Sequence, residues 1–87
     1  MSKVTKLILR FLNKPKDLTW DELVIVLNYY GYYEIATGKT GGSRRKFSNA
    51  TKMIISLHKP HPKTIVKSYV IDQVINHLKE KGDINND

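Results

Sequence analysis

Residues 43–58 read SRRKFSNATKMIISLH and predict two adjacent β-strands. After Gly31 the composition shifts toward β-favouring residues interrupted by glycines, so that three segments are typical of short strands: YYEIAT, SRRKFS and KMIISLH. The segments that join them, GKTGG and NAT, are short. Because short connections join neighbouring antiparallel strands, we expect the three strands to form an antiparallel meander.

Side-chain alternation along the second and third strands predicts two different faces. With Phe47 in the core, the core face also holds Arg45, Met53, Ile55 and Leu57. The opposite face holds Arg44, Lys46, Ser48, Ile54, Ser56 and His58. Matching the two core sets across the hairpin places Phe47 opposite Met53 and leaves residues 49–51 as the loop.

The same register brings polar side chains together on the outward face. It places Arg44 opposite Ser56 and diagonal to His58. Diagonal neighbours in a sheet lie about 7–8 Å apart, so these side chains can share one phosphate group. The preceding Gly41 and Gly42 permit close approach of a ligand, and they fit a plain turn equally well. The segment GKTGG does not match a P-loop, because the order GxxxxGK[ST] is missing.

The strongest helix signal lies in TWDELVIVLNYYGYY, residues 19–33. Thr19 and Glu22 have the spacing of a capping box, and Gly31 is typical of a helix end. The stretch therefore predicts a helix over residues 20–30.

Apolar residues at helical spacing predict two further helices, one before Pro15 and one from Ser68 to a stop at Gly82. The order α-α-β-β-β-α indicates an α+β fold, in which helices cover one face of a three-stranded antiparallel sheet and leave the other face open. We expect one domain over residues 1–87, with residues 1–16 as an N-terminal helical extension, 17–82 as the core and 83–87 as a frayed tail.

The composition restricts the possible chemistry. The 87-residue chain has no cysteine and therefore neither a disulfide nor a thiolate metal site. Its acids are scattered along the sequence, so we expect no metal site and no cofactor. No apolar run approaches the roughly 20 residues that span a bilayer, and no signal-peptide cleavage site follows the first apolar segment. We expect a cytoplasmic protein with no membrane partner.

The net charge of +7 is concentrated in one part of the chain, because residues 38–71 contain no Asp or Glu. Such a one-sided surface favours an anionic partner over a merely solvated surface, and RNA is the leading candidate. The predicted RNA-binding residues are Lys39, Ser43, Arg44, Arg45, Lys46, Lys59, His61, Lys63 and Lys67.

Three histidines are candidates for acid–base chemistry. His77 falls in the predicted last helix, where half-packing explains it, whereas His58 ends the third strand and His61 follows in the loop. An imidazole can accept the 2′-hydroxyl proton of RNA, and a guanidinium can stabilise the pentavalent phosphorane. His58 and Arg44 are therefore the candidate catalytic residues, although a histidine at such a position is more often a plain surface residue.

The ordered set of segments resembles the HicA-type toxins of toxin–antitoxin systems. The similarity covers residues 20–78: a helix ending in YYGYY, strands around TGGSRRKF, a third strand running into HKPHP, and a helix in VKSYVIDQVINHL. The resemblance implies a double-stranded-RNA-binding-like fold and metal-independent cleavage of messenger RNA. It also implies a cognate antitoxin protein that covers the active surface.

One position departs from that family pattern. Members carry Gly-Ser-His with a catalytic histidine at the start of the second strand, whereas this chain has Arg44 at that position. Three interpretations remain open: His58 has taken over from the adjacent strand, Arg44 sustains a weaker reaction, or the protein binds RNA without cleaving it. A fourth is an interaction subunit whose basic face docks an acidic partner.

Overall fold

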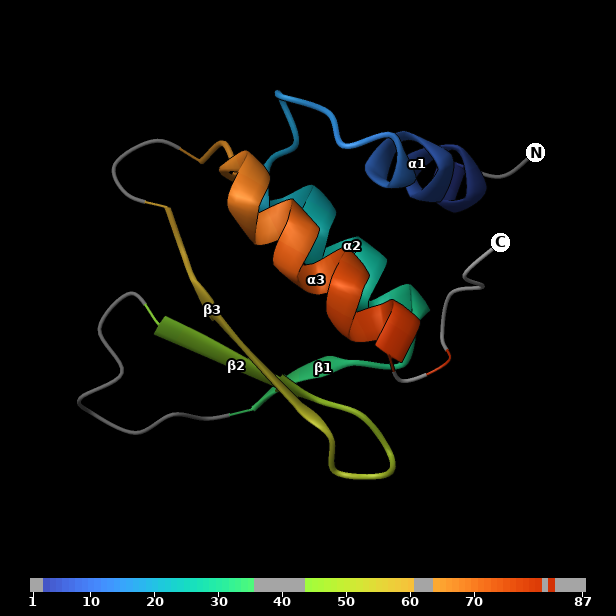
Figure 1. Ribbon diagram of the computed structural model, residues 1–87, viewed down its shortest axis with the longest axis vertical. Coiled ribbons are helices and arrows are strands. Elements are labelled where there is room, and N and C mark those ends of the chain that lie inside the picture. Colours follow the sequence, from blue (N-terminus) through green and yellow to red (C-terminus); the bar gives the residue numbers. More distant parts are fainter. Residues whose placement is uncertain (1–2, 36–43, 61–63, 81, 83–87) are drawn as a thin grey trace.

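The computed structural model describes residues 3–35, 44–60, 64–80 and 82. The helices within these ranges are α1 (Lys3–Leu12), α2 (Trp20–Tyr29) and α3 (Ser68–Glu80). The strands are β1 (Tyr33–Ile35), β2 (Arg44–Ser48) and β3 (Ile54–His58), which form an antiparallel sheet in the order β1-β2-β3. Figure 1 shows the helices on one side of this sheet. The α+β class and the three-stranded antiparallel sheet are confirmed.

A hydrophobic core joins the sheet to the helices. Phe47, Ile55 and Leu57 enter one buried cluster together with residues of all three helices, as alternation along the strands predicts. Helix α1 adds Ile8 and Phe11 to the same cluster, so the N-terminal extension shares the core of the domain. Among the described helices, none is long and apolar enough to cross a membrane.

Helix α2 begins at the predicted capping box. The Thr19 hydroxyl accepts a hydrogen bond from the Glu22 N–H at 3.2 Å, and the Glu22 carboxylate accepts one from the Thr19 N–H at 2.9 Å. The helix ends one residue earlier than predicted, at Tyr29, because Gly31 takes a φ of 88° and turns the chain toward β1.

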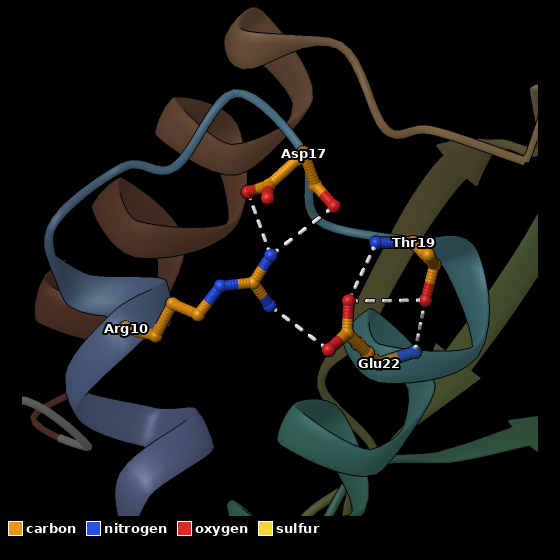
Figure 2. A network of polar contacts seen from close by, with 4 residues as sticks. All are labelled: Arg10, Asp17, Thr19 and Glu22. Atoms are coloured by element: carbon orange, nitrogen blue, oxygen red, sulfur yellow. Dashed lines mark hydrogen bonds and ion pairs between the residues drawn. The ribbon is translucent and has the colours of Figure 1, made fainter.

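A polar network ties α1 to the start of α2 (Figure 2). The Arg10 guanidinium donates to the Asp17 carboxylate at 2.6 Å and to the Glu22 carboxylate at 2.9 Å. The same Glu22 side chain closes the capping box, so one carboxylate both caps α2 and holds the preceding helix against it.

The predicted hairpin register is wrong by two residues. Phe47 pairs with Ile55 rather than with Met53, and the loop covers residues 49–53. The Asn49 side chain stabilises this longer loop, because its Oδ1 accepts hydrogen bonds from the Thr51 N–H, the Thr51 hydroxyl and the Met53 N–H. A shift of two residues preserves the faces, so every side chain still points to its predicted side.

Strand β1 is shorter than the predicted segment. Tyr32 precedes the strand and is fully buried, and Ala36 and Thr37 lie outside the described residues. Within the strand Glu34 pairs with Phe47 and therefore shares the helix-facing side, whereas Tyr33 and Ile35 point the other way.

Candidate nucleic-acid interface

The side of the sheet that faces away from the helices, here called the open face, carries the candidate site. Its described side chains are Tyr33, Ile35, Arg44, Lys46, Ser48, Ile54, Ser56 and His58. Strand pairing arranges them in rows across the sheet. Tyr33, Ser48 and Ile54 form one row, Ile35, Lys46 and Ser56 form the next, and Arg44 and His58 form the last.

The two candidate catalytic residues lie side by side. Arg44 pairs directly with His58, not with Ser56 as the shorter loop predicts. Directly opposed residues have Cβ atoms about 4.5–5.5 Å apart, which is closer than the predicted diagonal. The Arg44 guanidinium still reaches Ser56 diagonally and donates to its hydroxyl at 3.1 Å. The observed register therefore makes Arg44 and His58 direct cross-strand neighbours.

The neighbouring cations divide between the two sides of β2. Lys46 is exposed on the open face, in the row next to Arg44. Arg45 lies on the helix-facing side with Phe47, where its Nε contacts the Glu34 carboxylate at 3.3 Å. A ligand on the open face therefore meets Arg44 and Lys46 directly, whereas Arg45 contributes only a partly neutralised charge from behind.

The remaining predicted RNA-binding residues have different placements. Lys59 follows the end of β3 and is partly exposed, and Lys67 is exposed just before α3. Lys39, Ser43, His61 and Lys63 lie outside the described residues.

No acid occupies the described part of the open face. Asp17 and Glu22 form ion pairs with Arg10, and Asp72 forms an ion pair with Lys14 at 2.9 Å. Glu34 lies on the helix-facing side. Arg44 and Lys46 are therefore not neutralised by a carboxylate on their own face, which favours an anionic ligand there.

His77 lies elsewhere and has a packing role, as its helical position predicts. Its ring meets Tyr32 edge to face at a centroid distance of 5.7 Å, and its Nε2 lies 3.2 Å from the Tyr32 hydroxyl oxygen. The pair joins α3 to the segment before β1 and takes His77 away from the open face. Among the residues that the structure covers, no three His, Cys, Asp or Glu side chains come together as a metal site.

Of the apolar residues on the open face, the sequence predicts the outward position of Ile54 but not those of Tyr33 and Ile35. Tyr33, Ile35 and Ile54 are 59%, 38% and 52% exposed. The tyrosine cluster YYGYY suggests core packing as readily as ligand binding, and only Tyr32 of its members is fully buried. Alternation along β1 distinguishes the outward Tyr33 from the buried Tyr32, but it can be applied only after the strand has been located.

No family model, curated protein or solved structure matches the chain. The open face, through its residues and their geometry, is therefore the part of the molecule that indicates a function.

Proposed function

We propose that the protein is an RNA-binding toxin that cleaves messenger RNA without a metal ion, and that it works in the cytoplasm with a cognate antitoxin. The observation that carries the proposal is the direct pairing of Arg44 with His58 on a face without a described acid. The resemblance to HicA-type toxins supports the same function and a double-stranded-RNA-binding-like fold. The antitoxin would cover the open face.

The two side chains supply complementary chemistry. His58 accepts the proton of a ribose 2′-hydroxyl, and the 2′-oxygen forms a bond to the adjacent phosphorus. The bond from phosphorus to the 5′-oxygen breaks, and that oxygen takes a proton back from the His58 imidazolium. The products are a 2′,3′-cyclic phosphate and a 5′-hydroxyl. Arg44 donates hydrogen bonds to the phosphorane oxygens, where negative charge accumulates in the transition state.

Lys46 and the Ser56 hydroxyl help to position the phosphate. Lys46 lies one row from Arg44 on the same strand face, and Ser56 receives a hydrogen bond from Arg44. A guanidinium that is already oriented by Ser56 loses less conformational freedom when it binds an anion. We therefore assign RNA binding to Arg44 and Lys46 on this face, and catalysis to His58 and Arg44.

A second function, RNA binding without cleavage, is favoured by one specific observation. The family histidine is replaced by Arg44, and a single imidazole, that of His58, lies on the open face within the described residues. Under this alternative the same cations bind phosphates and no bond is broken.

Expression in a bacterial host separates the two functions. We expect the wild-type chain to arrest growth and to generate new RNA ends, and His58→Ala and Arg44→Ala to do neither. Arg45→Ala is the matched control, because it removes the same charge from the same strand on the opposite side. Circular dichroism of each purified variant verifies that it is folded. Folded wild-type protein that binds RNA but causes neither arrest nor cleavage would support the non-catalytic alternative, and absence of RNA binding would overturn both.

A further inference from the structure

The open face has two chemically different ends. Arg44 and His58 occupy the basic end, Tyr33 and Ile54 occupy the apolar end, and Lys46 pairs with Ile35 in the row between them. From Ser48 to Arg44 the chain advances four residues along β2, which separates the two outer rows by about 13 Å. The face therefore presents charge and apolar surface within reach of one short ligand.

We propose that the apolar end receives the bases of single-stranded RNA while the basic end holds its phosphates, with Tyr33 as the stacking platform. The inference rests on the proposed RNA-binding function and specifies its substrate: an unpaired strand. In a double helix the bases are stacked on one another and their faces are hidden, so an exposed aromatic ring gains a stacking partner only from an unpaired base.

The placement of Tyr33 fits this role. It lies in the row of Ser48 and Ile54, and Ile35 in the next row shares the face with it. A tyrosine ring on a flat sheet can lie against a base while its hydroxyl remains in water. Sheet surfaces that bind single-stranded RNA combine aromatic rings with neighbouring cations in the same way.

Charge argues for a nucleic acid at this face rather than an apolar protein segment. The row next to Tyr33 contains Lys46, and the last row contains Arg44. A wholly apolar partner on this surface would bury both cations without a counter-charge, which is costly. A strand of RNA places its phosphates against the cations and its bases against the apolar side chains. The cations then have a counter-charge, and the apolar side chains have a packing partner.

The test uses the purified full chain and a short 2′-O-methyl RNA, which lacks the free 2′-hydroxyl and cannot be cleaved by the proposed reaction. Binding is measured by fluorescence anisotropy to the single strand, to the same strand in a duplex, and to an abasic strand of equal length. The variants are Tyr33→Ala and Tyr33→Phe. Tyr69→Ala is the matched control, because Tyr69 is also 59% exposed but belongs to α3.

We expect the wild-type protein to prefer the single strand over the duplex. Tyr33→Ala should weaken single-strand binding about 5- to 100-fold, the range that one base–aromatic stack supports, and leave abasic binding unchanged. Tyr33→Phe should retain binding, and Tyr69→Ala should resemble the wild type. Lys46→Ala should weaken binding to all three probes and reduce the salt slope by about 0.7.

Each other outcome rejects an identifiable part of the argument. If Tyr33→Ala binds the single strand as tightly as Tyr69→Ala does, the stacking role is wrong and the RNA-binding function stands. If Tyr33→Ala weakens binding to the single strand and to the abasic strand by the same factor, the stacking role is also wrong, because the missing contact would not involve bases. If the wild type binds none of the three probes, the proposed function itself fails.

Discussion

Replacing Glu22 tests how the N-terminal helix is held to the domain. The Glu22 carboxylate accepts hydrogen bonds from the Thr19 N–H and from Arg10 (Figure 2). A hydrogen bond to a charged group contributes about 1.5–3 kcal/mol, and because the Glu22 side chain is 33% exposed, solvent screening reduces its contribution below that range. Glu22→Ala should therefore reduce the free energy of unfolding by about 1 kcal/mol at neutral pH, which corresponds to a fall of about 4–8 °C in Tm for a domain of this size.

The effect of Glu22 should depend on pH in a defined direction. The hydrogen bond from the Thr19 N–H, followed by the contact with Arg10, lowers the pKa of Glu22 in the folded protein. A carboxylate with a lowered folded pKa stabilises the fold above its unfolded pKa of about 4.3, and this contribution is lost as the pH falls through the folded value. The difference between the wild type and Glu22→Ala should therefore shrink in acid.

Urea unfolding followed by tryptophan fluorescence measures this difference. Trp20 is the single tryptophan of the chain, it is 5% exposed, and it lies at the start of α2 beside the network. Asp21→Ala is the matched control. Asp21 lies in the same helical turn, but it is exposed and takes no part in the capping box. A stability difference between wild type and Glu22→Ala that stays constant from neutral pH to about pH 3, below the ordinary range for a glutamate, would contradict a stabilising role for the ionised carboxylate.

Three further predictions concern the core, the hairpin and the candidate site. Phe47→Ala should reduce the free energy of unfolding by about 3–5 kcal/mol, because its side chain is fully buried; Ile55→Val should cost only about 0.5–1.5 kcal/mol in the same urea titration. Asn49→Ala removes the acceptor of three loop hydrogen bonds and should cost about 1–2 kcal/mol, with wild-type behaviour contradicting the assigned role of its side chain. The double variant Arg44→His/His58→Ala keeps one imidazole in the pair but lacks the guanidinium, so, like Arg44→Ala, it should generate no new RNA ends on a gel.

The elements of this fold were predictable because their signals are local. Thr19 and Glu22 predict the start of α2 from their spacing alone, and the structure contains both of their hydrogen bonds. The apolar repeat after Ser68 likewise predicts α3, whose inward residues are all buried. Such signals need no knowledge of the rest of the chain.

The hairpin register was not predictable, because it depends on how a loop satisfies its polar groups. Three residues are enough to close the hairpin, but the Asn49 side chain organises five, with Lys52 at a φ of 65°. Hydrophobic matching cannot detect a shift of two residues, since that shift keeps the same side chains in the core. The faces of β2 and β3 were therefore predicted correctly and their cross-strand partners were not.

The same distinction explains what was found and what was missed at the candidate site. Alternation alone assigns Arg44, Lys46 and His58 to one face, because it depends only on which strand residues are buried. Tyr33 requires the pairing of β1 with β2, and a strand of three residues carries too little alternation to establish that pairing. Tyr33 and Ile35 could therefore be placed on the open face only once the fold was known.

The identity of Arg44 limits which chemical roles this residue can take on the open face. A guanidinium stays protonated in proteins, so Arg44 cannot accept the 2′-hydroxyl proton, and cleavage needs a base from elsewhere. His58 is the described imidazole directly across the pair, at a position where it can reach the same phosphate. The exchange of residues in Arg44→His/His58→Ala keeps an imidazole in the pair and removes the guanidinium. Absence of cleavage in this variant is the expected result and would show that cleavage requires the charge of Arg44, whereas cleavage would show that an imidazole can act from either strand without the guanidinium.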